Sequence, residues 1–311
     1  MAHGLVSGVT EPSAAPRVLA LPDVFLDHFV YLGKDELESL VNLLKGKEGR
    51  SRLRQELGLG GNACNFALHL SKLGVNTVLV AKVSELVFGE LVRRAQRLPL
   101  DLSYIEKSGN QSLTVAFELA DGSNSSSINL NHPGNLLDFG PEDVPPAALN
   151  GHYDAIGVFN WANNRRSLEL CRRVFKGRRT IKLVDLGTPA LRRDDVHEIR
   201  EVCRVADILS ANEVETIFLA HALDLTSKPE VEHCAKAIAG LGVTVALRAK
   251  NYTAEVDGNG WVEVSFKRRR VRKSTGAGDA WNAAYICAKV RGASAKESLV
   301  FANDYAASSL S

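Results

Sequence analysis

Residues 274–279, Ser-Thr-Gly-Ala-Gly-Asp, combine bare backbone with a carboxylate, and a small apolar run over 280–288 follows them. Two glycines and an alanine allow a charged ligand to approach the backbone N–H groups closely. The run lacks proline and glycine and is rich in alanine, which predicts a buried helix. Glycine-rich backbone opening onto a helix N-terminus forms an anion site, because unpaired N–H groups and the helix dipole both favour negative charge.

Asp279 is unexpected at such a site, since a carboxylate repels the anion that the loop attracts. It could cap the helix, which Asp does well, and the loop alone slightly favours that interpretation. Alternatively it is a general base that takes a proton from a hydroxyl while the loop holds a transferring phosphoryl group. Other segments of the chain favour the base.

The elements around this loop alternate between strand and helix, which predicts an α/β fold with a largely parallel sheet and helices on both faces. Polar residues follow several of the predicted strands. Because open parallel sheets bind ligands at the carboxyl ends of their strands, these side chains are expected to converge on one edge. They are Asp185, Asn212, Glu215, Arg248 and Asp279.

The middle of the chain departs from this alternation. Residues 112–119 and 126–130 each alternate apolar with polar residues around Asp121-Gly122, which predicts a hairpin. A hairpin is marginal alone, so it is expected to join the strand that carries Asp27 as a small lid over 25–33 and 110–132. Asn129 and Asn131 are interpreted as turn chemistry in preference to ligand contacts. Residues 34–57 are charged and periodic, and are expected to be helical.

A second glycine-rich turn, 58–61, opens a predicted helix that begins at Asn62 and ends at Gly74. One interpretation is a tight strand–helix turn with Asn62 as cap. The other places the bare backbone of this turn and the amides of Asn62 and Asn65 against a hydroxylated substrate. Asp27 has two interpretations as well: the polar side of a half-exposed strand, or a carboxylate that binds a polyol hydroxyl.

Asn212 and Glu215 share one face if the local turn is helical. A carboxylate and an amide near phosphates suit Mg²⁺, held partly through waters. The alternative is a capping box, with Asn212 as cap and Glu215 as its partner. The basic run 267–273 is interpreted mainly as a solvated segment, whose last members could attract a nucleotide.

Composition limits the partners. The 311 residues contain 38 Lys and Arg against 36 Asp and Glu, too balanced to indicate nucleic acid or an anionic membrane. Five widely spaced cysteines argue against zinc and a disulfide framework, and favour a reducing cytoplasm. No apolar run approaches a membrane span. Residues 1–16 are expected to be a flexible tail, and 17–311 one domain with its lid.

From about Val18 to Ala307 the chain resembles the ribokinase/PfkB family of ATP-dependent sugar and nucleoside kinases. Residues 274–279 closely match the C-terminal signature of that family, and residues 60–74 match the N-terminal one. Residues 212–215 match its Asn-x-x-Glu motif. Three departures stand out: Ser84 and Arg248 replace glycines, and Leu86 replaces an Asp that often helps bind substrate. The departure at Leu86 weakens any assignment of a common hexose or ribose.

This resemblance implies a ribokinase-like three-layer sandwich with a mostly parallel central sheet and a β lid. It implies that Asp279 is the catalytic base and that the amides of Gly276, Ala277 and Gly278 form the anion hole. It places Mg²⁺ near Asn212 and Glu215. The residues implied on the substrate side are Asp27, Gly61 and Asn65. The residues implied to bind the nucleotide are Asn212, Arg248, Thr275, Gly278 and Asn303.

The implied reaction is phosphoryl transfer from ATP·Mg²⁺ to an alcohol of a sugar or sugar-like substrate, with a monovalent cation left open as a further cofactor. A nucleoside kinase is the alternative within the family. A non-catalytic sugar- or nucleotide-binding homologue is kept open by Ser84, Leu86 and Arg248. An NAD-dependent dehydrogenase is disfavoured, because no GxGxxG follows the first strand. The partners expected are small molecules, with a homodimer through the lid left open.

Overall fold

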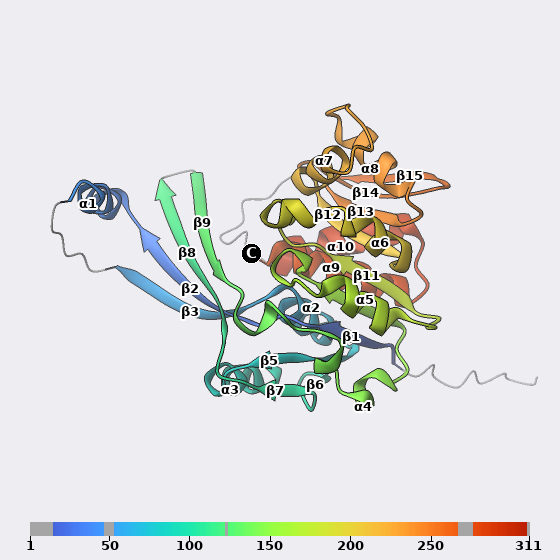
Figure 1. Ribbon diagram of the computed structural model, residues 1–311, viewed down its shortest axis with the longest axis horizontal. Coiled ribbons are helices and arrows are strands. Elements are labelled where there is room, and N and C mark those ends of the chain that lie inside the picture. The colour runs from blue at the N-terminus through green and yellow to red at the C-terminus, as the bar shows by residue number, and fades with distance from the viewer. Residues whose placement is uncertain (1–14, 47–52, 122–123, 267–275, 310–311) are drawn as a thin grey trace, which may run out of the picture.

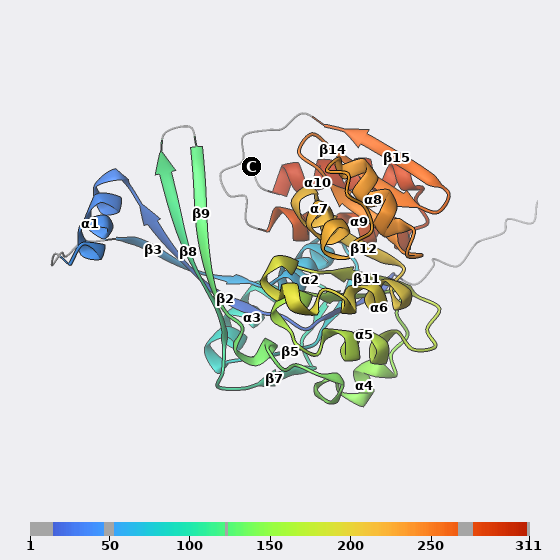
Figure 2. The same ribbon diagram turned by 45° about the horizontal axis from the view of Figure 1, so that its top comes forward.

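The computed structural model describes residues 15–46, 53–121, 124–266 and 276–309. Figures 1 and 2 show two bodies of secondary structure: a large layered α/β body and a twisted four-stranded sheet that extends from it. The functional site is built where the two meet, so both bodies matter for the chemistry.

The central sheet of the large body has the strand order β15-β14-β13-β12-β11-β10-β1-β4-β6. In this spatial order, all neighbours from β13 to β6 pair in parallel. β14 and β15 add an antiparallel edge beside β13. The bounds are β1 (Arg17–Leu21), β4 (Asn76–Leu79), β6 (Leu100–Asp101), β10 (Ala155–Phe159), β11 (Ile181–Asp185), β12 (Ile208–Asn212), β13 (Thr244–Arg248), β14 (Tyr252–Asp257) and β15 (Gly260–Ser265).

Helices cover both faces of this sheet, because its strands are apolar on both sides. In β1, Leu19 and Leu21 enter one core, and Val18 and Ala20 enter the other. The first core is closed by α5 (Ser167–Phe175), α6 (Glu198–Val205), α7 (Glu213–Ala222) and α8 (Val231–Ala239). The second is closed by α2 (Asn62–Lys72), α3 (Glu85–Ala95), α9 (Ala277–Val290) and α10 (Ala295–Ser309). The expected fold class, helices on both faces of a mostly parallel sheet, is confirmed.

Short elements complete the body. Two strands, β5 (Ala81–Val83) and β7 (Ile105–Lys107), pair in parallel as a sheet of their own. The short helices are α4 (Pro146–Leu149), η1 (Gly134–Leu136), η2 (Pro141–Asp143), η3 (Trp161–Asn163) and η4 (Pro189–Asp195). No helix in the described residues is both long and apolar enough to cross a membrane.

The second sheet has the order β3-β2-β8-β9, with β2 (Phe25–Leu32), β3 (Arg54–Gly60), β8 (Ser112–Asp121) and β9 (Asn124–His132). The hairpin β8–β9 joins the strand that carries Asp27, as expected, with Asp27 opposite Thr114. The expectation of a helix over 34–57 is confirmed for α1 (Lys34–Leu44) and is wrong for residues 54–57, which begin β3. α1 ends at Leu44, and β3 pairs antiparallel with β2 over its whole length, because tertiary pairing outweighs local propensity there.

Candidate active site

A cavity of about 270 Å³ lies at the carboxyl ends of the central strands, where the four-stranded sheet meets the α/β body. β2, β8 and β9 supply one wall, and the strand ends and the first turns of α2 and α9 supply the other. The cavity brings together most of the residues predicted from sequence. Those that line it are Asp27, Gly61, Asn65, Asp185, Glu215, Arg248, Gly276, Gly278 and Asp279.

Strand order explains why the cavity lies at this edge. From β1 the chain passes to β4 on one side of the sheet and later to β10 on the other, which makes β1/β10 a switch point where α/β sheets bind ligands. Asp23 follows β1, and Asn160 follows β10. The side-chain amide of Asn160 donates to Asp23 Oδ2 at 3.1 Å, and so joins the two strand ends.

Asp23 also anchors the first turn of α2. Its carboxylate accepts hydrogen bonds from the backbone N–H groups of Asn62 at 2.8 Å and Ala63 at 2.9 Å. Asp23 is 1% exposed, and this burial raises its pKa against the lowering effect of those bonds. The sequence predictions did not include Asp23, although a polar residue directly after a buried first strand was a usable signal.

The glycine turn that was predicted to bind an anion opens α9. Gly276 precedes the helix in the left-handed conformation, with φ 86° and ψ −4°, which costs glycine little. Among the described residues no side chain forms a cap hydrogen bond at the start of α9, so the capping interpretation of Asp279 finds no support there. Its carboxylate Oδ2 instead accepts a 2.9 Å hydrogen bond from the side-chain amide of Asn65. Thr275, also predicted to bind nucleotide, lies outside the described residues.

Asp279 is 8% exposed, and its environment opposes its charged form. Burial raises the pKa of this carboxyl well above its usual range, and the nearby charge of Asp185 raises it further. The hydrogen bond from Asn65 and the charge of Arg248 act in the opposite direction. A carboxylate destabilised in this way is a stronger proton acceptor, which suits a general base.

Asp185 lies at the centre of a buried polar network. Its Oδ1 accepts from the amide of Asn62 at 3.1 Å and from the backbone N–H of Gly187 at 3.0 Å. Its Oδ2 accepts from the amide of Asn282 at 2.9 Å and faces Arg248 at 3.5 Å. The position of Asp185 at this edge was expected, but its role in holding both glycine turns depends on contacts that spacing does not reveal.

Arg248 reaches the same network from the end of β13. Its Nη1 donates to Ser210 Oγ at 2.5 Å and to Asn282 Oδ1 at 2.7 Å. A Cβ built on Gly278 would lie 3.5 Å from the guanidinium carbon, so Arg248 lies against the anion loop. The side chain is 17% exposed and is held in place by these partners. Arg248 therefore presents a fixed positive charge to anything bound by the loop.

Asn212 and Glu215 form a reciprocal capping box at the start of α7. Asn212 Oδ1 accepts from the backbone of Glu215 at 2.9 Å, and Glu215 Oε2 accepts from the backbone of Asn212 at 2.8 Å. Glu215 also lines the cavity, whereas Asn212 does not. Burial, followed by the charge of Asp185, raises the pKa of Glu215 to about 7. Its carboxylate fits one position in the oxygen shell of Mg²⁺, while the described residues hold no cluster of three metal-ligating side chains.

The four-stranded sheet supplies the other wall. Asp27 is 7% exposed and hydrogen-bonds to Thr114, and burial raises the pKa of its carboxyl to about 6. Its carboxylate lies so close to Gly60 that a side chain there would collide with it. Asn129 and Asn131 line the cavity from β9, so interpreting them as turn residues was wrong. They alternate inward along a strand, which places both on one face.

Asn303, predicted near an adenine pocket, lies on α10 and outside the cavity lining. Its Oδ1 accepts from the indole of Trp281 at 2.8 Å and from the hydroxyl of Thr253 at 3.1 Å. Its side-chain Nδ2 is buried without a partner in the described structure. The structure thus does not bring Asn303 together with the residues of the cavity.

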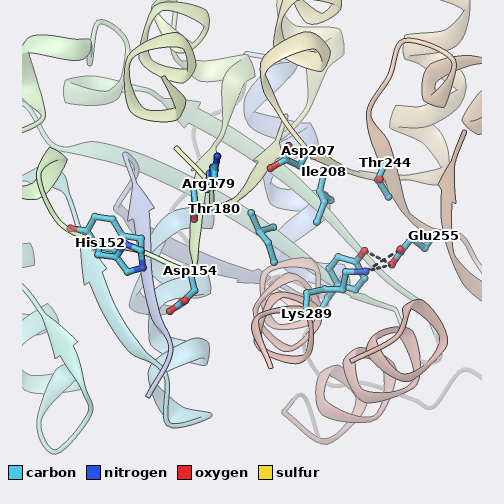
Figure 3. Close-up of a pocket in the computed structure, with 12 residues that line it drawn as sticks. His152, Asp154, Arg179, Thr180, Asp207, Ile208, Thr244, Glu255 and Lys289 are labelled. Carbon is cyan, nitrogen blue, oxygen red and sulfur yellow. Dashed lines mark hydrogen bonds and ion pairs between the residues drawn. The ribbon is translucent and has the colours of Figure 1, made fainter. Parts of the chain in front are cut away.

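A larger cavity, about 430 Å³, lies at the opposite, amino-terminal edge of the strands (Figure 3). Its acidic side chains already accept hydrogen bonds from neighbouring residues of the fold. Asp154 and Asp207 accept from backbone N–H groups, of Arg17 at 2.8 Å and Lys182 at 2.9 Å. Glu255 accepts from Tyr285 at 2.6 Å and from Lys289 at 3.1 Å. This cavity has neither of the two glycine turns, so the smaller one is the candidate active site.

Comparison with known proteins agrees with this geometry. The family model of the pfkB family carbohydrate kinases matches residues 39–311. No curated protein sequence matches the chain. Among solved structures, a ribokinase of Arabidopsis thaliana complexed with ribose and ATP has a TM-score of 0.72 at 22% identity, over 94% of this chain and 92% of that one.

Two further structures share the fold. An adenosine kinase of Sinorhizobium meliloti has a TM-score of 0.73 at 18% identity, over 94% of this chain and 92% of that one. A putative ribokinase II of E. coli in complex with ATP and Mg²⁺ has a TM-score of 0.72 at 16% identity, over 95% and 92%. The family match spans most of the sequence and includes both glycine turns of the cavity. The chain therefore belongs to the pfkB family of carbohydrate kinases.

Proposed function

We propose that this protein is an ATP-dependent kinase that transfers the γ-phosphoryl group of Mg·ATP to a hydroxyl of a sugar or sugar-like substrate. The observation that carries the proposal is the position of Asp279. Its carboxylate lies in the first turn of α9, the helix whose glycine loop opens on the cavity. Asn65 orients that carboxylate from the facing helix α2. A proton acceptor beside an anion loop is the arrangement that phosphoryl transfer to an alcohol requires.

In this proposal Asp279 accepts the proton of the acceptor hydroxyl as the oxygen attacks the γ-phosphorus, the bond from that phosphorus to the β–γ bridging oxygen breaks, and ADP leaves. The backbone N–H groups of Gly276, Ala277 and Gly278 then stabilise the charge that develops on the transferring phosphoryl group. These N–H groups belong to the start of α9, where no earlier carbonyl of the helix can accept from them. The kinase structures of similar fold that contain ribose, ATP or Mg²⁺ support the class of ligand.

Arg248, Thr275, Asn212 and Asn303 are proposed to contact the nucleotide, with Arg248 nearest the phosphates because it lies against the loop at Gly278. Glu215, with Asn212 beside it, is proposed to hold Mg²⁺ partly through waters. When bound, that ion would neutralise phosphate charge and help orient the transferring group.

Asp27, Gly61 and Asn65 are proposed to bind the acceptor, and the four-stranded sheet is proposed to act as a lid. Its strands supply one wall of the cavity, so a shift toward the body would exclude water that would otherwise hydrolyse ATP. Ile128 and Leu130 are 57% and 58% exposed on β9, which supports a homodimer through this sheet. Five buried free thiols are compatible with the proposed cytoplasmic location.

A nucleoside acceptor is the second candidate, because Phe25 and Phe29 line the cavity and could pack against a base. The decisive experiment is ADP formation with Mg·ATP across hexoses, pentoses, inositols, sugar acids and nucleosides. Asp279→Asn is expected to fold and to lose turnover by about 10²- to 10⁴-fold, the usual contribution of a general base. Asp304→Asn, an exposed acid on α10, is the matched control.

Full turnover by Asp279→Asn would refute the assignment of the base. ATP binding without turnover of any acceptor would instead identify a non-catalytic homologue that senses its ligand. Both outcomes are read from the same protein preparations, by calorimetry for binding and by a coupled assay for ADP.

A further inference from the structure

Charge is unevenly distributed in the candidate active site. Among the described residues that line the cavity, Arg248 is the sole lysine or arginine, and it lies at the end formed by the anion loop. The acidic groups of the lining are Asp27, Asp185, Glu215 and Asp279. The guanidinium of Arg248 is therefore held at one end of the cavity, where it donates hydrogen bonds to Ser210 and Asn282.

The opposite end, between the first turn of α2 and the inward face of β2, β8 and β9, is lined by neutral or acidic groups. Asp27 and Thr114 face each other across β2 and β8, and Asn131 lies opposite Thr114 on β9. Asn65 lines the cavity from α2, where its side-chain amide donates to Asp279. None of these side chains carries a positive charge, so no described residue that lines this end would pair with a carboxylate or phosphate on the acceptor.

One cation acts on Asp27 from outside the cavity. The charge of Arg94 lowers the pKa of Asp27, but less than burial raises it. Arg94 is not part of the lining, and its guanidinium forms an ion pair with Glu90 at 2.8 Å on α3. Glu90 also pairs with Arg93 at 2.6 Å, so an ion pair holds Arg94 on the surface of α3 and not in the wall of the cavity.

We infer that the acceptor is an uncharged, hydroxyl-rich molecule, and that sugar acids and sugar phosphates are excluded by charge. The inference rests on the proposed kinase function and deepens it. An anion at this end would be taken out of water beside Asp27 without a compensating partner. A hydroxyl can donate to the carboxylate of Asp27 and accept from the amides of Asn65 and Asn131, so it satisfies both kinds of group.

The first test compares carboxylates with carboxamides of the same shape. Binding of gluconate and gluconamide, glucuronate and glucuronamide, and galacturonate and galacturonamide is measured by calorimetry, together with the neutral parent sugars. At least one neutral compound is expected to bind at least tenfold more tightly than its carboxylate partner. Equal or tighter binding of the carboxylates, or no binding of any neutral compound, would overturn the inference.

Turnover of the same compounds keeps the two proposals apart. Turnover of a sugar acid in preference to its neutral counterparts would overturn the charge inference and leave the kinase function standing. Binding of neutral sugars without turnover of any compound would contradict the kinase function and support the charge inference.

The second test introduces the missing cation. Asn131→Lys places an ammonium in the wall of the cavity, and His132→Lys places the same charge on the neighbouring residue, which lies outside the lining. Adjacent strand residues point to opposite faces, so the pair isolates position from net charge. Asn131→Lys is expected to raise the affinity for carboxylate relative to carboxamide at least tenfold. An unchanged ratio, or an equal rise in His132→Lys, would contradict the inference.

Discussion

The side-chain amide of Asn65 donates a 2.9 Å hydrogen bond to the carboxylate of Asp279, across 214 residues of sequence. The contact joins the first turn of α2 to the first turn of α9, so the two glycine-opened helices meet at one pair of side chains. Asn65 thereby orients the proposed base and favours its charged form.

Replacing Asn65 by leucine is expected to lower kcat/KM by about 10- to 100-fold and to move the acidic limb of its pH profile to higher pH. The shift follows because loss of the hydrogen bond raises the pKa of Asp279, so the base is deprotonated only at higher pH. In a double-mutant cycle, Asn65→Leu should cost little once Asp279 is already Asn. Additive losses would show that Asn65 acts independently of Asp279.

Substitutions in the capping box at α7 can distinguish a structural role from a role in binding Mg²⁺. Asn212→Ala removes the cap and is expected to reduce the free energy of unfolding by about 1 kcal/mol. Glu215→Gln keeps an oxygen that can accept from the backbone of Asn212 but removes the charge that Mg²⁺ would need. It is expected to leave stability within about 1 kcal/mol of wild type and to raise the Mg²⁺ concentration for half-maximal turnover about tenfold. An unchanged Mg²⁺ requirement in Glu215→Gln would remove Glu215 from the metal site.

The buried carboxyl of Asp27 predicts a pH-dependent cost in stability. Its pKa is raised to about 6 in the folded protein, so the folded state binds the proton more tightly than the unfolded state does. The contribution of Asp27 to the free energy of unfolding is therefore largest at low pH and declines as the pH rises from about 4 through about 6. Asp27→Asn lacks this titration.

The stability of Asp27→Asn relative to wild type is thus expected to increase over that pH range, by up to about 3 kcal/mol, and to stay level above it. Urea denaturation between pH 4 and pH 8 measures the difference, with Asp304→Asn as the exposed control. If the difference in stability between the two proteins is constant with pH, the pKa of Asp27 is not raised in the folded state.

Gly61 and Gly74 form a matched pair for the N-terminal glycine turn. Both have positive φ, 92° and 76°, but a Cβ on Gly61 would lie 2.8 Å from the backbone oxygen of Asp23, whereas Gly74 has open space. Alanine at Gly74 is expected to cost about 1 kcal/mol from backbone strain alone. Alanine at Gly61 should cost about 3 kcal/mol or more, because the strand end must also shift. Equal costs in chemical denaturation would show that the close approach is easily relieved.

Much of the architecture could be predicted from the residues alone, because it depends on local constraints. Alternating burial on both faces of short apolar strands specifies a sheet covered by helices on both sides, as in Val18 to Leu21. Glycines at 61 and 276 specify turns with positive φ that open helices. The family and the polar edge of the sheet followed from the same motifs, and the family match confirms the first.

Other features were decided only by tertiary structure. Residues 54–60 form a strand because β2 offers them an edge to pair with, although 54–57 were interpreted as helical and 58–60 as part of a turn. Three contacts of the site depend on segments that are far apart in sequence. Arg248 lies against Gly278, Asp23 anchors α2, and Asn131 points into the cavity. Residue types and local spacing specify which chemical groups reach this edge of the sheet. Long-range packing decided which of them meet, because burial and hydrogen-bond partners belong to the folded arrangement and not to local spacing.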